Sequence, residues 1–333
     1  MTLFIGDLHL GKRLPHSTLE SNQRFWNYTL NKLEQILEES ASQRPVVQLG
    51  DLFDKPKVGH LTLTQGYLIA KEFDVILQGN HDFNADLTKD TALSCLPKID
   101  SGLEKNLMDS PTKRNPLTLV GHQPTQELFE QDLKSLEENK VLCLHANSPN
   151  HPEPGLTENT ITPEMLAELK DKFEHIICGH EHNFSQMGNL TMLGSFMPFS
   201  FGDMSDKKIA TWNPNSGLDF VTTWSKAEKY LECSHEEFIE LPLDHAYQFI
   251  EVKGEVTSSE WSSITSHINH LFIGSDVFAI KDSTSIQGVV NSSQEDYSES
   301  SVLSWEEDAY NRIKEEINQE AADSFKRISD ETK

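Results

Sequence analysis

The 333-residue sequence is poor in basic side chains, with 28 Lys and Arg against 53 Asp and Glu and a formal net charge of −25. Proteins that bind nucleic acid non-specifically do so through basic surface that neutralises phosphates, and an acidic surface repels DNA at long range. A nucleic-acid substrate would therefore require bound divalent metals, a local basic patch or a partner. Without such a substrate, the charge serves only to keep the protein soluble.

Long apolar runs are also missing, so no segment is expected to span a bilayer. Met1 and Thr2 lead straight into an apolar segment without a basic flank or cleavage site, and we expect a cytoplasmic protein that is not secreted. The four cysteines are scattered without metal-site spacing, and Cys143 and Cys178 lie in apolar runs. We expect reduced thiols rather than disulfides.

What the sequence does contain is an alternation of short apolar segments and amphipathic ones. The apolar segments, predicted as strands, are Thr2–Ile5 and residues 45–49, 74–77, 117–120, 141–144, 173–178 and 190–193, with a closing hairpin at 208–212 and 218–223. The predicted helices are Leu19–Glu39, residues 58–71 and 126–138, and one that begins at Pro163 after the N-cap Thr162. Residues 83–116 show no clear pattern. The alternation predicts an α/β fold with polar turns at the carboxyl ends of the strands.

These polar turns contain residue types that ligate metals. They read Gly6-Asp7-Leu8-His9, Gly50-Asp51-Leu52-Phe53-Asp54, Gly79-Asn80-His81-Asp82, a strand-end His145 and Gly179-His180-Glu181-His182. Carboxylate, amide and imidazole groups are common ligands of divalent metals, and residues two apart project to the same side. Each motif alone could be an ordinary turn, but all of them in order predict one metal site. His122, His151 and His175 lack this context, and we expect them to be structural or solvent-facing.

The composition changes after residue 224. Strands predicted at residues 237–243, 247–256 and 276–281, with a helix at 258–271, form a small α/β unit. Residues 283–301 are rich in Ser, Gln and Asn and predict a flexible linker. From residue 302, apolar side chains at helical spacing predict a helix that either packs back weakly or, as we favour, docks on a partner. The predicted domains are residues 1–224, 225–282, 283–301 and 302–333.

The ordered motifs resemble those of the calcineurin-like metallophosphoesterase superfamily over residues 2–223. Within it, the sequence is similar to SbcD-type nuclease subunits of DNA double-strand-break repair, including phage recombination endonuclease subunits. That likeness rests on His9-Leu10-Gly11-Lys12-Arg13-Leu14, on Gly194-Ser195 with Ser200-Phe201-Gly202-Asp203 and Lys207-Lys208, and on the layout after residue 224. The resemblance implies a β-sandwich flanked by helices, a small α/β capping domain and a C-terminal helical ATPase-binding segment.

The resemblance also implies the roles of the site residues. One metal would take Asp7, His9, Asp51 and His182, and the other Asp51, Asn80, His145 and His180, so that Asp51 is shared. His81 would stabilise the transition state or protonate the leaving oxygen, with Asp82 orienting its ring. Two cations about 4 Å apart would bind the phosphate oxygens and activate the attacking water. Mixed oxygen and nitrogen ligands favour manganese, with iron or magnesium as alternatives, over a closed zinc site.

The function implied by the resemblance is that of a metal-dependent DNA exonuclease and endonuclease in repair, recombination or replication. Its expected partners are DNA, an SbcC-type coiled-coil ATPase and a second copy of the chain, with Phe25, Trp26 and the helix after Asp54 as candidate dimer contacts. The main alternative is a stand-alone small-molecule or cyclic-nucleotide phosphodiesterase. A protein Ser/Thr phosphatase would have Arg where this sequence has Gln78, which disfavours that class. Every predicted metal position has a competent ligand, which disfavours an inactive scaffold. The expected lack of a signal peptide disfavours a secreted nucleotidase.

Overall fold

The computed structural model describes residues 1–84, 90–108, 110–151 and 158–286. The chain divides into a compact unit of residues 1–285 and a second unit of residues 286–333. The helix predicted from residue 302 and most of the predicted linker lie outside the described residues. Within the described part of the chain, no helix has the length and apolar character needed to cross a membrane.

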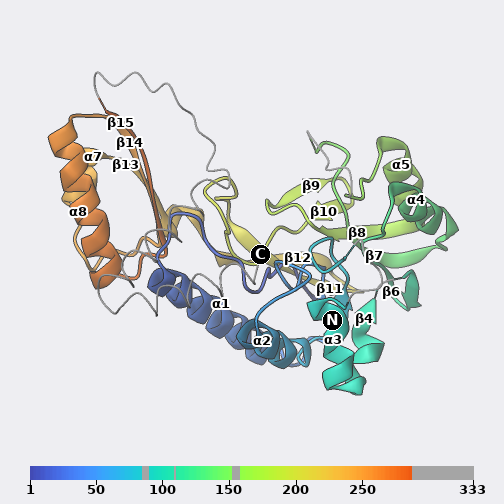
Figure 1. Cartoon of the computed structure of the whole chain (residues 1–333). Helices are drawn as coiled ribbons and strands as arrows, with labels where there is room; N and C mark the ends of the chain where they lie inside the picture. The colour runs from blue at the N-terminus through green and yellow to red at the C-terminus, as the bar shows by residue number, and fades with distance from the viewer. Residues whose placement is uncertain (85–89, 109, 152–157, 287–333) are drawn as a thin grey trace. The chain divides into compact units, whose positions relative to one another are not determined.

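The larger part of the first unit is built on two sheets (Figure 1). The first has the order β12-β11-β1-β2-β3-β4 and consists of β1 (Thr2–Ile5), β2 (Val46–Gln48), β3 (Val75–Leu77), β4 (Leu107–Met108), β11 (Lys207–Asn213) and β12 (Gly217–Trp224). The second has the order β5-β6-β7-β8-β10-β9 and consists of β5 (Thr112–Arg114), β6 (Leu117–Val120), β7 (Asn139–His145), β8 (Phe173–Gly179), β9 (Ser185–Met187) and β10 (Leu190–Met192). Because β1–β3 are mutually parallel, as are β7 and β8, each sheet gathers several strand ends at one edge.

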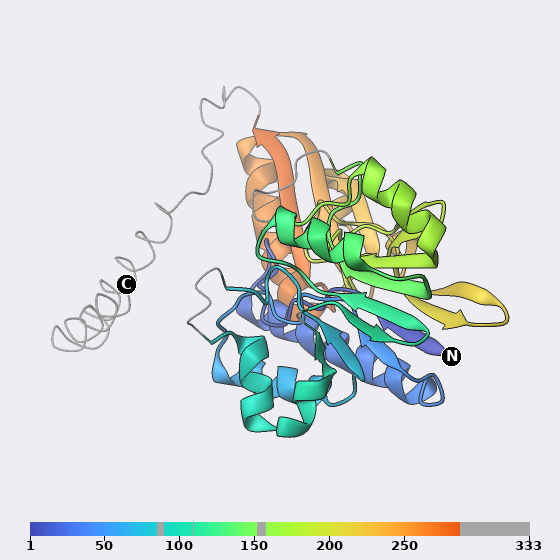
Figure 2. The ribbon, with the colours of Figure 1, turned by 90° about the vertical axis from the view of Figure 1, so that its right-hand side faces the viewer.

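Apolar side chains from both sheets meet in a shared inner core that includes Phe4, Val47, Leu119, Cys143 and Ile177. Helices α1 (Leu19–Glu39), α2 (His60–Ala70), α3 (Ala92–Ile99) and η1 (Ser101–Asn106) cover the first sheet, and α4 (Gln126–Ser135) and α5 (Pro163–Lys172) cover the second. Figure 2 shows these helix layers on opposite sides of the strands. The predicted mixed α/β fold is confirmed.

Helix α1 has the bounds predicted from the sequence, because its N-cap is encoded locally. Thr18 Oγ1 accepts a hydrogen bond from Ser21 N at 3.0 Å, and Thr18 N donates to Ser21 Oγ at 2.9 Å. Phe25 and Trp26 are both buried in the core of this same unit. Their proposed use as dimer contacts is therefore wrong, because they have little surface left to offer a partner.

A third sheet, with the order β13-β14-β15, follows the second strand of the closing hairpin. Its elements are α6 (Lys226–Lys229), β13 (Tyr230–Ser234), α7 (His235–Ile239), β14 (Phe249–Val256), α8 (Ser258–Gly274) and β15 (Ala279–Ile286). The strand predicted at residues 237–243 is wrong, because Ser234 and Glu237 form a capping box that starts α7 instead. The predicted boundary between residues 224 and 225 lies inside the first compact unit and stays a prediction.

An aromatic cluster joins the third sheet to the rest of this unit. The ring of Phe25 on α1 lies 6.1 Å from Phe199, 6.5 Å from Phe249 on β14 and 5.5 Å from Phe278, between ring centroids. Arg24 adds a polar tie by donating from Nη2 to the Phe272 carbonyl at 2.8 Å. The third sheet is thus fixed to α1 and to the loop that contains Phe199.

Candidate dimetal centre

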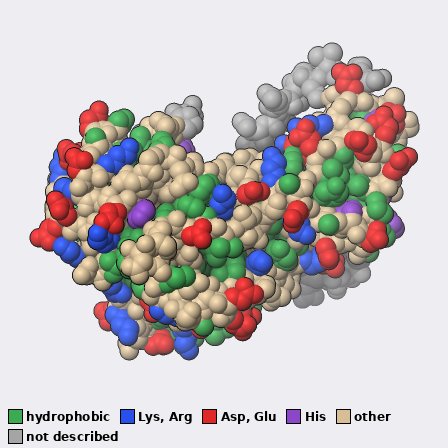
Figure 3. All heavy atoms as spheres, turned by 180° about the vertical axis from the view of Figure 1, so that it is seen from behind, with side chains coloured by type: hydrophobic (Ala, Val, Ile, Leu, Met, Phe, Trp, Pro, Cys, Tyr) green, Lys and Arg blue, Asp and Glu red, His purple; other side chains and the backbone are tan. Residues whose placement is uncertain are grey.

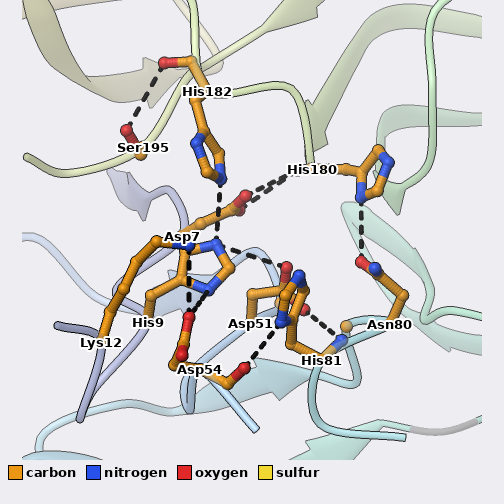
Figure 4. A network of polar contacts seen from close by, with 12 residues as sticks. Asp7, His9, Lys12, Asp51, Asp54, Asn80, His81, His180, His182 and Ser195 are labelled. Carbon is orange, nitrogen blue, oxygen red and sulfur yellow. Dashed lines mark hydrogen bonds and ion pairs between the residues drawn. The ribbon is translucent and has the colours of Figure 1, made fainter. Parts of the chain in front are cut away.

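The residues predicted as metal ligands come together where the two sheets meet (Figure 4). Asp7 and His9 follow β1, Asp51 follows β2, Asn80 follows β3, His145 ends β7, and His180 and His182 follow β8. Strands from both sheets therefore contribute, and the sandwich supplies the proximity that sequence distance hides. A cavity of about 610 Å³ opens over them, lined in part by Asp51, Asn80, His81, His180 and His182.

Asp51 lies at the centre of this cluster. Its Oδ2 is 3.6 Å from His9 Nε2 on one side and 3.5 Å from His145 Nε2 on the other. Its Oδ1 accepts a hydrogen bond from His81 N at 2.9 Å, which fixes the rotation of the carboxylate. Burial opposes ionisation, but His145 and His9 beside it hold the pKa of Asp51 well below its usual value. An ionised oxygen between two groups of donors has the geometry of a shared ligand.

The first group of donors consists of Asp7, His9 and His182, whose ligand atoms lie within 4.8 Å of one another. His9 Nε2 is 3.0 Å from His182 Nε2. Burial holds the pKa of His9 well below its usual value, so its ring is neutral and has a free lone pair. The buried carboxylate of Asp7 is held in place by the His180 backbone N–H, 3.0 Å from Oδ2.

The second group surrounds Asn80. Asn80 Oδ1 lies 3.0 Å from His145 Nε2 and 2.9 Å from His180 Nδ1, and Asp51 completes the group. In each group, oxygen and imidazole nitrogen atoms converge on one point. Each group therefore fits one divalent cation. When bound, the two cations supply charge neutralisation for phosphate oxygens and activation of the attacking water. The contacts described next are all between groups of the protein.

Each of the four histidines predicted as ligands has its second ring nitrogen near a polar group. The pairs are His145 Nδ1 with the Leu49 carbonyl (2.8 Å), His182 Nδ1 with Asp203 Oδ2 (3.3 Å), His180 Nε2 with Glu158 Oε2 (3.6 Å) and His9 Nδ1 with Asp54 Oδ1 (3.6 Å). Outer hydrogen bonds orient metal-binding imidazoles and select their tautomer. His145 Nδ1 has such a bond, whereas His9 Nδ1 forms no hydrogen bond within the described residues. No local spacing in the sequence identified Glu158, and Asp203 stood only in a motif without a role.

His81 is held by a backbone oxygen rather than by a carboxylate. Its Nδ1 lies 2.7 Å from the Asp54 carbonyl. A carbonyl oxygen only accepts hydrogen bonds, so Nδ1 carries the proton and Nε2 is the atom left for a substrate. The ring stands edge-on to His9, with centroids 4.7 Å apart. His81 therefore has one fixed orientation beside the first group of donors.

The predicted role of Asp82 as the residue that orients this ring needs correction. Its carboxylate accepts hydrogen bonds from the backbone N–H groups of Leu52 (3.1 Å), Phe53 (3.0 Å) and Gly79 (3.1 Å). Asp82 is buried and ties the turn after β2 to the turn after β3. It positions the backbone of both turns, while the Asp54 carbonyl orients the ring of His81.

The backbone of the centre is strained at three proposed ligands. His9 (φ 45°), Asp51 (φ 53°) and His180 (φ 89°) all have left-handed backbone conformations, which are uncommon for residues other than glycine. Such conformations cost of order 1–3 kcal/mol each and cluster at functional sites. Their presence at three of the seven proposed ligands indicates that ligand direction takes precedence over local backbone preference.

Two motif glycines are explained by close approach. A Cβ atom on Gly79 would lie 2.0 Å from Asp51 Oδ1, and one on Gly50 would lie 2.2 Å from His145 Nδ1. Gly50 also has a φ of 103°, which side chains rarely permit. The glycine before each ligand therefore makes room for a ligand from another strand.

Other polar residues line the cavity that sequence reasoning did not assign to the site. They are Asn147, His151, Glu158, Glu181, Asn183 and Ser200. His151, which the sequence predicts to be structural or solvent-facing, lines this cavity because the fold brings its loop beside the centre. His122 is buried, as a structural histidine would be, and burial lowers its pKa to about 3.

A family model described as calcineurin-like phosphoesterase matches residues 1–184. That range contains every proposed ligand and His81. Among solved structures, the crystal structure of a metallophosphoesterase from Sphaerobacter thermophilus is similar at 13% sequence identity, covering 66% of this chain and 87% of that chain with a TM-score of 0.30. No curated protein matches the chain. The family assignment rests on the sequence match.

Proposed function

Because the chain belongs to the calcineurin-like phosphoesterase family of metal-dependent phosphoester hydrolases, we propose that it is a DNA nuclease subunit of the SbcD type. It would hydrolyse phosphodiester bonds in the cytoplasm during DNA repair, recombination or replication. We assign one cation to Asp7, His9, Asp51 and His182 and the other to Asp51, Asn80, His145 and His180, with His81 as the catalytic residue. We propose manganese at both positions, because mixed oxygen and nitrogen ligands suit it.

The main support for the proposal is that both SbcD-like segments, residues 9–14 and 194–208, contribute side chains beside the centre. Lys12, from the first segment, lies 3.3 Å from Asp54, whose carbonyl orients His81. Asp203, from the second, faces the ring of the proposed ligand His182. Segments that a general phosphoesterase site does not require are thus built into the surroundings of these ligands, which supports the finer assignment.

The fixed position of His81 supports a role in leaving-group departure. Cleavage of a DNA backbone expels an alkoxide, a poor leaving group that needs a proton, and a positioned acid contributes about 10²–10⁴-fold to such a step. The Asp54 carbonyl, 2.7 Å from Nδ1, directs Nε2 outward. When the ring is protonated, Nε2 is the nitrogen that gives its proton to the leaving oxygen.

A local concentration of basic residues supports DNA as the substrate despite the acidic composition. The parallel bridge between Leu10 and Phe53 places the loop with Lys12 and Arg13 beside the loop with Lys55 and Lys57. On the face shown in Figure 3, basic and acidic side chains are interspersed. A phosphate backbone could be neutralised along these two loops, beside the centre that Asp54 helps to form.

The partners are part of the same proposal. An SbcC-type ATPase would bind residues 302–333, and deletion of these residues should abolish co-purification of the two proteins. Association with the ATPase that survives the deletion of residues 302–333 would contradict the docking role.

Two copies of this chain would pair along a groove of about 620 Å³ between α1 and α2. Leu37 and Leu68 help to line this groove, and Leu61 is also exposed on α2.

The central experiment compares two substrates with manganese present: linear double-stranded DNA and bis-p-nitrophenyl phosphate. We expect the wild type to cleave both. His81→Gln should lose about 10²–10⁴-fold on DNA and far less on the nitrophenyl ester, because nitrophenolate departs without a proton. If the wild type cleaves the ester but not DNA, alone or with its ATPase, the chain is a small-molecule phosphodiesterase.

The basic loops have a separate test in the salt dependence of DNA binding. The triple substitution Arg13→Gln, Lys55→Gln and Lys57→Gln should weaken binding and reduce the slope of log K against log salt by about 0.9 for each lost phosphate contact. A matched control removes the same charge elsewhere, at Lys113, Lys134 and Lys140. Equal slopes for the two triple variants would exclude these loops as the DNA contact.

A further inference from the structure

A buried lysine lies next to the centre without a part in the chemistry described so far. The side chain of Lys207, at the start of β11, has no exposed surface. Burying an ammonium group costs several kcal/mol unless it is paired and hydrogen-bonded. A fold keeps such a group only where its contacts are good, so the partners of Lys207 indicate what it does.

Both hydrogen bonds of the Lys207 ammonium group go to His182 and to Asp203, the residue that faces the ring of His182. Its Nζ donates to the His182 carbonyl at 2.8 Å and to the Asp203 carbonyl at 2.7 Å. Ser195 N also donates to the His182 carbonyl, at 3.1 Å, and Ser195 Oγ donates to the same oxygen at 3.5 Å (Figure 4). The ammonium group therefore joins the backbone of the ligand to the backbone of the residue that faces its ring.

The side chain of Asp203 completes the connection. Its Oδ2 lies 3.3 Å from His182 Nδ1 and accepts from Phe199 N at 3.0 Å, while its Oδ1 accepts from Ser200 N at 2.8 Å. These bonds fix the carboxylate within its own loop. A proton on His182 Nδ1 then satisfies Asp203 and leaves Nε2, 3.0 Å from His9 Nε2, with its lone pair free.

His182 needs this support more than the other ligands of its group. Its side chain is 27% exposed, whereas those of Asp7 and His9 are 0% exposed. Core packing cannot hold a ring that faces an open cavity, so its direction depends on polar contacts. Phe199 covers only one side, with its ring centroid 5.8 Å from that of His182.

We propose that Lys207 and Asp203 are positioning residues that set the affinity of the cation position formed by Asp7, His9 and His182. Lys207 fixes the backbone of His182, and Asp203 fixes its ring and tautomer. The other cation position, around Asn80, does not depend on them. The inference rests on the proposed dimetal centre and adds that its two positions are controlled separately.

The test is a manganese titration of the metal-free protein, measured by calorimetry and by electron paramagnetic resonance. In Lys207→Met and in Asp203→Asn, one of the two binding steps should weaken by about 10–100-fold while the other keeps its wild-type affinity. At limiting manganese, the spectrum of a coupled pair should give way to that of isolated ions. Lys208→Met is the matched control, since Lys208 follows directly and lies over the Phe184 ring at 4.0 Å; it should behave as wild type.

Two wild-type affinities in both Lys207→Met and Asp203→Asn would overturn the inference. Equal weakening of both steps would also overturn it, because that is the result of general loosening. Asp203→Asn decides the matter if Lys207→Met does not fold. A wild type that binds two manganese ions but cleaves no DNA would contradict the nuclease proposal and leave this one standing. A wild type that binds none would overturn both.

Discussion

At the scale of single residues, Asp51 combines two properties that make its substitution informative. It faces donors on both sides, and its backbone is left-handed. Asparagine tolerates that conformation better than most residues do and keeps the Oδ1 acceptor for His81 N. The substitution Asp51→Asn therefore removes the negative charge of the side chain and keeps its size and shape.

We therefore expect Asp51→Asn to weaken both manganese positions together by more than about 100-fold, beyond the usual 10–100-fold effect of losing an outer-shell group. The far-ultraviolet circular dichroism spectrum should stay that of the wild type. Asp219→Asn, the same change at an exposed position of β12, is the control. Loss of only one binding step, measured by titration calorimetry, would show that Asp51 is not shared.

Single residues also show why the sequence predicted the ligands but not their supports. Asp51 follows β2 and His145 ends β7, so both lie at the end of an apolar run, a pattern that the local sequence shows. The group that orients His81 is a backbone carbonyl, which has no residue type to recognise. Lys207 and Glu158 reach the centre through loop paths and strand pairing between distant segments. Such contacts depend on the whole backbone and cannot be obtained from spacing.

At the scale of elements, the third sheet is held by a carboxylate network on β14. Glu251 accepts from Lys281 Nζ (2.8 Å), Ser283 Oγ (2.9 Å) and Tyr230 Oη (2.8 Å), which joins β13, β14 and β15. Burial opposes ionisation, but Lys281 and these hydroxyl groups lower the pKa of Glu251 from an ordinary 4.5 to about 2. The ionised form is therefore the one that stabilises the sheet.

Because the folded pKa lies below the unfolded one, this contribution is complete above pH 4.5 and declines as the pH falls toward 2. Glu251→Gln should lower the free energy of unfolding at neutral pH by about 1.5–3 kcal/mol, the range for hydrogen bonds to a charged group. The difference from wild type should shrink in urea titrations as the pH falls from 5 to about 2. Glu255→Gln, exposed on the same strand, should show no such pH dependence.

Elements differ in how far local signals define them. Helix α1 has the bounds that the apolar spacing predicts, and in the structure Thr18 caps its first turn. Residues 83–116 resisted prediction because α3 contains Pro97 and because β4 and β5 are only two and three residues long, too short to show a period. The capping box of Ser234 and Glu237 starts α7, where the apolar pattern predicts a strand at residues 237–243.

At the scale of the whole molecule, the centre concentrates buried negative charge that a cation would compensate. Asp7 and Asp51 are both almost fully buried, and burial, followed by the charge of Asp51, raises the pKa of Asp7. A ligand that binds only the folded state stabilises it by about 2.7 kcal/mol at 100 times its Kd. Manganese should therefore raise the melting temperature of the wild type, and a chelator should lower it.

The control for this effect is Asp51→Asn, whose melting temperature should respond far less to manganese. A wild type and an Asp51→Asn variant with the same manganese response would contradict binding at this centre. The composition of the whole chain does not predict this stabilisation by manganese. A net charge of −25 describes the average surface, whereas Asp7 and Asp51 lie beneath it.

The aromatic cluster of Phe25, Phe199, Phe249 and Phe278 bears on how the protein would respond to a cut in its backbone. The composition changes at residue 224, which makes that point look like a place to divide the chain, but these rings pack across it. A protease nick near residue 225 should therefore leave two fragments that still migrate as one particle in gel filtration and separate only in denaturant. The portion before residue 224, produced alone, would expose Phe25 and Phe199 and should aggregate; a stable monomeric fragment would instead support the predicted boundary between residues 224 and 225.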